Sequence, residues 1–210
     1  WCALAAVPSA LLAATTQQIC LEVAAVPLLW ALPLALYLAT FVVCFAARRP
    51  APRLSWLLRF AGAATAAAIA LAKGAELDFG LQILAFSLAL VAGSMICHGE
   101  LARSRPEPAN LTTFYLAVAL GGALGAAFVA VLAPALFPEV WELPLLLGAI
   151  VPLIAGAWWH DPQSPLREDH RGGELPAALA FGAAAFGAAL LALGAREGGR
   201  FDVPYALVAG

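Results

Sequence analysis

The hydrophobic and polar positions of this chain alternate in long blocks. Apolar runs are separated by short connections rich in Pro, Gly and charged residues. An α-helix needs about 20 apolar residues to cross a bilayer, and seven runs approach that length: 1–14, 19–47, 54–72, 81–102, 111–137, 143–159 and 175–195. They are continuous and Ala-rich, without the period of two typical of membrane β-strands. The pattern predicts an all-α, polytopic transmembrane helix bundle of about seven spans.

Three of these runs have features of their own. Run 1–14 is short, and because the chain begins with Trp1 and no basic segment precedes it, we expect a fragment of a larger bundle. Run 19–47 would be about 43 Å long as a helix and carries Pro27 and Pro33, so we expect it to be tilted, kinked or broken there. In run 111–137, Gly121 and Gly125 stand four apart, a spacing that lets two helices approach closely.

Composition strengthens the membrane assignment. The chain has 210 residues, is 63% hydrophobic and carries 11 basic and 13 acidic residues, for a net charge of -2. A lipid bilayer is therefore the expected partner, together with further helices or a soluble domain of the same polypeptide, and nucleic acid is excluded because there is no basic patch. The four cysteines lie in or beside apolar runs without a CxxC pair, which favours buried hydrophobic roles.

The distribution of Lys and Arg predicts the orientation of the helices. If the helices alternate in direction, three basic residues fall on one side and eight on the other: Arg48, Arg49, Arg53, Arg59, Arg103, Arg105, Arg167 and Arg171. The side with eight is expected to be cytoplasmic, in a multi-pass protein of the cell inner membrane. Trp56, Trp158 and Trp159 are then expected to anchor the cytoplasmic interface, and Trp141 the outer one.

Two acidic residues, Glu22 and Glu100, lie within or at the edge of the apolar runs. A carboxylate in hydrocarbon needs a partner or water. For Glu100 the nearest candidate is Arg103, three residues on, which would close the helix end with a local ion pair. For Glu22, two interpretations remain open: an acid in the first turn of a helix, favoured by its dipole, or part of a substrate site beside a broken helix.

His98 and Glu100 form a second candidate. Imidazole titrates near neutral pH, so the two could bind a ligand or relay a proton, although residues two apart point to different sides of a helix. We expect His98 or Glu100 to come within hydrogen-bond distance of the helix that starts at Leu111, near Thr112 to Tyr115, directly or through water. The candidate substrate-binding residues are Glu22, His98, Glu100, Arg103 and Tyr115.

No residue pattern predicts catalysis, a cofactor or a metal. His160, Asp161, Asp169 and His170 share one loop, but they lack His-x3-His spacing and cysteine support, so a solvated loop is expected there. Gly121 and Gly122 follow no strand and are not a phosphate-binding loop.

Two stretches resemble the bacterial fused major-facilitator/spermidine-synthase-like membrane proteins: Ala24 to Leu38, "AAVPLLWALPLALYL", and Cys97 to Gly122, which begins "CHGELARSRP". The resemblance implies a membrane region linked to an aminopropyltransferase-like domain beyond Gly210. That soluble domain is absent from this sequence, so none of its catalytic residues is transferred here.

Two functions remain open at this point. The helices could move a small cationic metabolite such as a polyamine, with Glu22, His98 and Glu100 as counter-charges. Alternatively, they form a non-catalytic membrane anchor or scaffold for a spermidine-synthase-like domain, with Glu100 and Arg103 holding helices together. An internal repeat would favour transport, and none is convincing in this sequence.

Overall fold

The described part of the chain is all-helical. The computed structural model describes residues 1–22, 29–47, 52–137, 141–159 and 161. Within these ranges it contains no strand, and the longer elements in chain order are α1 (Cys2–Glu22), α2 (Ala31–Ala46), α3 (Arg53–Lys73), α4 (Phe79–Arg103), α5 (Leu111–Ala127) and α7 (Glu142–Trp159). The predicted all-α bundle is therefore confirmed. Run 175–195 lies outside the described residues.

Five of the helical segments are long and apolar enough to cross a membrane: Cys2–Cys20, Arg53–Lys73, Phe79–Arg103, Pro108–Leu136 and Glu142–Trp159. The apolar helix α2 is shorter than these. Seven spans are thus not confirmed in the described residues. Four helical segments begin and end within two residues of the expected bounds. They span 53–73, 79–103, 111–136 and 142–159, where runs 54–72, 81–102, 111–137 and 143–159 were expected.

The boundary between the first two runs was wrong. The runs 1–14 and 19–47 predict a connection at Thr15 to Gln18. This polar stretch lies instead inside α1, which continues to Glu22. The helix tolerates the stretch because the Thr16 hydroxyl donates to the Leu12 carbonyl oxygen (2.8 Å) one turn earlier. The expected break near the prolines is confirmed by the turn at Leu29 and Trp30. Helix α2 starts at Ala31, so Pro33 lies in its first turn, where the missing N–H costs little.

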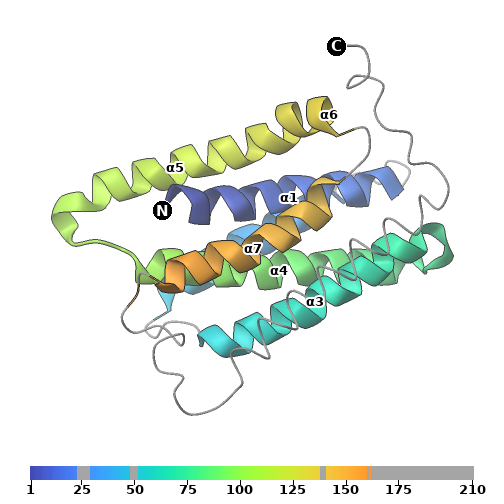
Figure 1. Cartoon of the computed structure of the whole chain (residues 1–210), viewed down its shortest axis with the longest axis horizontal. Helices are drawn as coiled ribbons and strands as arrows, with labels where there is room; N and C mark the ends of the chain where they lie inside the picture. Colours follow the sequence, from blue (N-terminus) through green and yellow to red (C-terminus); the bar gives the residue numbers. More distant parts are fainter. Residues whose placement is uncertain (23–28, 48–51, 138–140, 160, 162–210) are drawn as a thin grey trace.

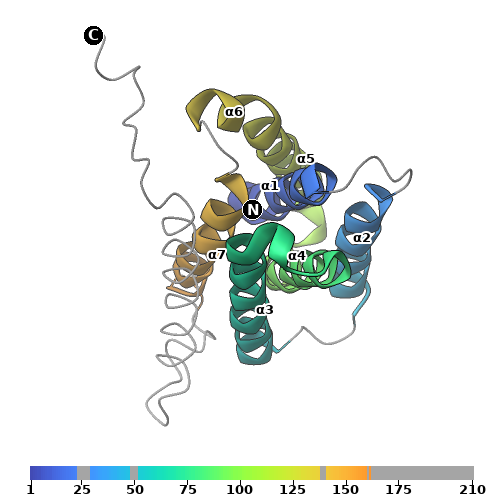
Figure 2. The same ribbon diagram turned by 90° about the vertical axis from the view of Figure 1, so that its right-hand side faces the viewer.

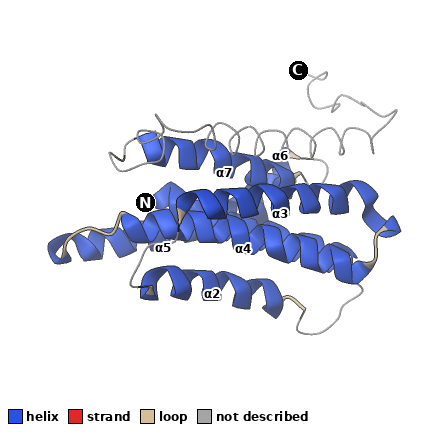
Figure 3. Cartoon of the chain, turned by 90° about the horizontal axis from the view of Figure 1, so that it is seen from below, coloured by secondary structure: helices blue, strands red, loops and turns tan. Residues whose placement is uncertain are grey.

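Two helices, α1 and α4, form the centre of the bundle (Figures 1 and 2). Helix α5 packs along α1, α3 packs along α4, and α7 packs against both α1 and α4. Helix α2 lies along α4 (Figure 3). Ala and Leu side chains dominate the buried surface, with Phe60, Phe86 and Trp158 among the largest fully buried side chains. Most of α5 away from α1 is exposed and apolar, as expected for a surface that faces lipid.

The predicted glycine pair brings α5 against α1. A Cβ atom at Gly125 would collide with the Ala6 carbonyl oxygen, and one at Gly121 with that of Cys2. The Ser9 hydroxyl adds a hydrogen bond to the Gly122 carbonyl oxygen, 2.8 Å long. The close approach expected from Gly121 and Gly125 is therefore confirmed, because only glycine leaves room for the neighbouring backbone.

Helix α5 widens near its end. A π-helical turn, Phe128–Leu132, leads into α6 (Ala133–Leu136), whose second residue is Pro134. Proline carries no N–H and its ring crowds the carbonyl four residues earlier, so it interrupts the regular helical hydrogen-bond pattern. The wider π-helical turn makes room for the ring. The wider turn stands beside α1 and shapes the groove described below.

Candidate functional site

The strongest polar site joins three helix ends. Arg53 is the first residue of α3, and its side chain is only 9% exposed. Its guanidinium donates from Nε to Oε1 of Glu100 (2.7 Å) and from Nη2 to Oε2 (2.8 Å), and Nη2 also donates to Asp161 just after α7. We call Arg53, Glu100, Arg103 and Asp161 the Arg53 cluster. Its fork-shaped contact with Glu100 is the geometry in which Arg binds a carboxylate most tightly.

The charges of the Arg53 cluster explain why the helices meet here. Arg53 stands at the N-terminus of α3 and Glu100 in the last turns of α4, so each charge is at the end of its own helix where the dipole disfavours it. Because α3 and α4 are antiparallel, the two unfavourable positions face each other and compensate. Trp158 covers the site, with its ring centroid 5.9 Å from Cζ of Arg53.

Arg103 contributes less than the sequence predicted. Its Nε is 3.6 Å from Oε1 of Glu100, beyond hydrogen-bond distance, whereas Arg53 bonds both oxygens. The local i, i+3 pair therefore exists, but the main partner comes from another helix. The missed residue had a signal: Arg53 follows Pro52 at the start of an apolar run, at the end of the bundle to which Glu100 was assigned.

His98 lies on another face of α4, as the helical spacing predicts. It is 1% exposed, and its Nδ1 is 3.1 Å from the Thr40 hydroxyl oxygen of α2. That hydroxyl is also 2.7 Å from the Tyr37 carbonyl oxygen, which can only accept. Thr40 thus donates its one proton to Tyr37, and His98 donates from Nδ1–H to Thr40. The rings of Tyr37 and Phe41 stand edge-on to the imidazole at 5.0 and 5.2 Å.

The expected direct hydrogen bond of His98 or Glu100 with the start of α5 is not found among the described residues. The hydrogen bonds of these two side chains within the described ranges run to α2 and α3 instead. Helix α5 packs mainly on α1 because of the glycine contacts, which turn it away from α4. Tyr115 is 43% exposed and contacts Phe114, so it does not join the candidate site.

Three other expectations concern neighbouring residues. Glu22 ends α1 and is not in the first turn of a helix, so the favourable interaction of an acid with the helix dipole does not apply. Its side chain lies outside what the structure describes.

Trp158 is fully buried, so its expected role at the membrane interface was wrong, whereas Trp159 is 72% exposed. Asp161 pairs with Arg53, which corrects the prediction that it belongs to a solvated loop.

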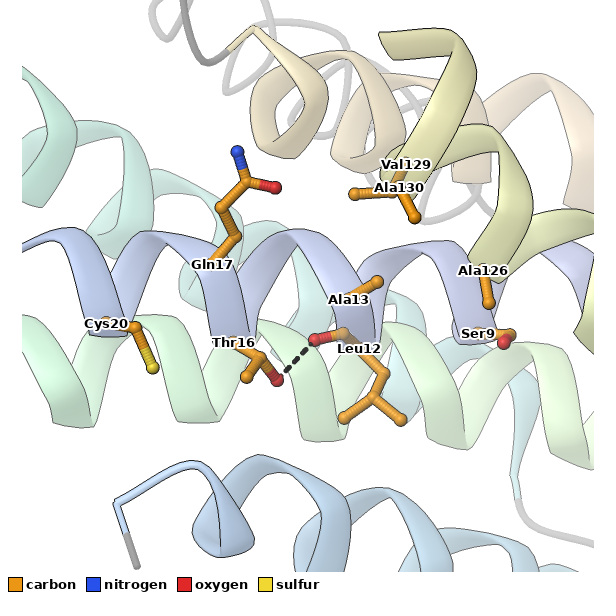
Figure 4. Close-up of a pocket in the computed structure, with 9 residues that line it drawn as sticks. All are labelled: Ser9, Leu12, Ala13, Thr16, Gln17, Cys20, Ala126, Val129 and Ala130. Carbon is orange, nitrogen blue, oxygen red and sulfur yellow. Dashed lines mark hydrogen bonds between the residues drawn. The ribbon is translucent and has the colours of Figure 1, made fainter. Parts of the chain in front are cut away.

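A groove of about 460 Å³ runs between α1 and the π-helical turn after α5 (Figure 4). It contains none of the candidate residues. The hydroxyls of Ser9 and Thr16 at its wall are bonded to backbone oxygens, so the wall offers mostly apolar contact. No group of three or more potential metal-ligating side chains occurs among the described residues.

Comparisons of the chain with protein-family models, with curated proteins and with solved structures find no match. The resemblance to fused spermidine-synthase-like proteins therefore stays a prediction, and the function has to be argued from the bundle itself.

Proposed function

We propose that this chain is a multi-pass membrane anchor, the helical region of a protein similar to the bacterial fused major-facilitator/spermidine-synthase-like proteins. Five apolar helices of membrane length support the anchoring role. The quoted stretches Ala24 to Leu38 and Cys97 to Gly122 support the family assignment. The bilayer would be the inner membrane, with the Arg53 end of the bundle in the cytoplasm, in line with the distribution of Lys and Arg.

The observation that carries this proposal is the pairing of Glu100. Its carboxylate is 6% exposed and both of its oxygens accept from Arg53. A carboxylate that neutralises a transported cation needs an open path to it, whereas this one joins α4 to α3 and, through Arg53, to the end of α7. Such a group stabilises the arrangement of helices on which a linked domain would be held.

Transport of a small cation such as a polyamine is the competing function. The candidate substrate-binding residues do not come together for it where their side chains are described: His98 faces α2, Glu100 faces α3 and Tyr115 points outward from α5. The space among Arg53, Glu100 and Trp158 amounts to about 10 Å³, too little for more than one water molecule.

The test separates the two functions. The chain, reconstituted in liposomes, is assayed for uptake of radiolabelled spermidine and putrescine, with protein-free liposomes as control. The anchor proposal expects no saturable uptake and no difference between the wild type and Glu100→Gln. A green fluorescent protein fused after Gly210 should stay with the membrane fraction after alkaline carbonate washing. Saturable uptake that Glu100→Gln abolishes would establish transport instead.

A further inference from the structure

The groove between α1 and the π-helical turn lies toward the end of the bundle opposite the Arg53 cluster. Helix α1 begins near that cluster, since Nε1 of Trp1 donates to the carbonyl oxygen of Ser104 at the end of α4 (3.0 Å). The glycine contacts hold α5 against α1 as far as Ala6, and beyond them the two helices diverge (Figures 1 and 2). The groove occupies this wedge, and its α1 wall extends from Ser9 to Cys20.

The dimensions of the groove match one hydrocarbon chain. From Ser9 to Cys20 it is about 16 Å long by helical rise, and the hydrocarbon of one leaflet is about 15 Å thick. Over that length, its volume of about 460 Å³ corresponds to a mean cross-section of about 30 Å². An α-helix with its side chains is about 10 Å wide and needs more than twice that area. The groove therefore suits a single extended chain better than a further helix.

One polar side chain of the groove lacks a partner. Figure 4 shows Gln17 extending from α1 on the side of Ala13 and the π-helical turn, and its amide has no hydrogen bond among the described residues. The hydroxyls of Ser9 and Thr16, by contrast, are bonded to backbone oxygens. Gln17 lies about 8 Å from the end of α1 by helical rise, near the edge of the hydrocarbon core. An amide without a partner at that depth is unfavourable, so its N–H groups favour a ligand that carries an acceptor.

We propose that this groove binds one acyl chain of a diacyl phospholipid, from the leaflet opposite the Arg53 cluster, and that the Gln17 amide donates a hydrogen bond to the ester carbonyl oxygen of that chain. Ester groups lie at the boundary between headgroups and hydrocarbon, which is the depth of Gln17. From there the chain would run along the apolar wall formed by Leu12, Ala13 and Val129. The π-helical turn supplies the width of the groove, and such turns are frequent at functional sites.

The experiment measures phospholipid binding to the whole chain, purified in detergent, by native mass spectrometry. Phosphatidylethanolamine with two ester-linked chains is titrated in parallel with its diether counterpart, which has the same headgroup and chain length but no carbonyl oxygen. One neutral hydrogen bond corresponds to a change in affinity of about three- to tenfold. The wild type should bind one ester lipid with an affinity higher than that for the diether lipid by this factor.

Variants locate the site. Gln17→Leu should bind both lipids with the lower affinity, so that the preference for the ester disappears. Thr16→Val is the matched control, because the hydroxyl it removes is already bonded to the Leu12 carbonyl oxygen and the preference should remain. Ala130→Trp fills the groove and should lower the affinity for both lipids by more than about tenfold. Ala123→Trp, at an exposed position of α5 outside the groove, should leave both affinities unchanged.

Four results would overturn the proposal. The first is a wild type that forms no complex with the ester lipid, and the second is equal affinity in the wild type and Ala130→Trp, which would mean that lipid binds elsewhere on the surface. The third is equal affinity of the wild type for the ester and diether lipids. The fourth is a lipid-free dimer that Ala130→Trp disrupts, which would assign the groove to a second copy of the chain. If Ala130→Trp does not fold, Gln17→Leu decides, and an ester preference that persists in it contradicts the site.

Discussion

The two ends of the bundle hold buried carboxylates in opposite conditions. At one end, Glu100 receives two hydrogen bonds from Arg53, which also bonds Asp161. At the other end, Glu142 is buried more deeply, and among the described residues its Oε2 has no donor. A buried charge is stabilising only together with its partners. The carboxylate of the first end is thus paired within the described residues, and that of the second end is not.

The largest effect is expected from breaking the complete end. Arg53→Ala would leave both Glu100 and Asp161 without their shared donor, and removal of one partner from a buried ion pair costs about 3 to 5 kcal/mol. Unfolding by increasing SDS in mixed micelles, followed by tryptophan fluorescence, measures this loss. The double variant Arg53→Gln with Glu100→Gln should lose less than Arg53→Ala, because the buried Glu100 charge is removed with its partner and only the more exposed Asp161 loses Arg53. A larger loss in the double variant would contradict the role assigned to the ion pair.

The opposite end should respond with the opposite sign. Glu142→Gln removes, at constant side-chain size, a buried carboxylate that no described residue compensates, and should raise the free energy of unfolding by about 1 to 3 kcal/mol. The same SDS titration measures it. Glu100→Gln provides the matched comparison, since it changes a buried Glu to Gln at the other end and should be destabilising. Loss of stability in both variants would show that the two ends do not differ as described.

The sequence predicts the helices well because length and hydropathy determine membrane spans locally. The runs at 54–72, 81–102 and 143–159 each became a helix within two residues of the expected ends. The sequence-based boundary failed at Thr15 to Gln18, because polarity suggested a connection. Inside α1 the Thr16 hydroxyl bonds the Leu12 carbonyl oxygen and so does not compete for the backbone in a non-helical conformation.

Site prediction depended on which helices pack together, and that is not a local property. The sequence correctly singled out Glu100 and His98 as polar residues that need partners. It assigned Glu100 to Arg103 of the same helix and expected His98 or Glu100 to approach α5, whereas Arg53 and Thr40 supply the contacts. Glu142 was overlooked because it flanks an apolar run, where an acidic residue is ordinarily solvated. Only the packing of the bundle shows that it is 2% exposed.

A smaller effect is expected at His98, which is buried like the two carboxylates but is paired through a neutral hydrogen bond. Thr40→Val keeps the shape of the side chain and removes the hydroxyl that accepts from Nδ1–H of His98 (3.1 Å). The loss should be about 1 kcal/mol, typical of one neutral hydrogen bond, in the same SDS titration. Tyr115→Phe, at an exposed position on α5, is the control with no expected change. A loss comparable to that of Arg53→Ala would place His98 in a charged network instead.

The smallest effect should come from Arg103, and it sharpens the contrast between local and interhelical pairing. Its Nε is 3.6 Å from Glu100 and its side chain is 26% exposed, so water screens the attraction. Exposed ion pairs contribute about 0 to 1 kcal/mol, so the attraction between Arg103 and Glu100 should be worth no more than that, because Glu100 keeps both hydrogen bonds from Arg53. A double-mutant cycle between Arg103→Gln and Glu100→Gln, in the same titration, should give a coupling energy below that of the Arg53 and Glu100 cycle. A larger coupling in the Arg103 cycle would show that the local pair predicted from the sequence holds Glu100. The ion pair of Arg53 with Glu100 would then not be the main polar contact between α3 and α4.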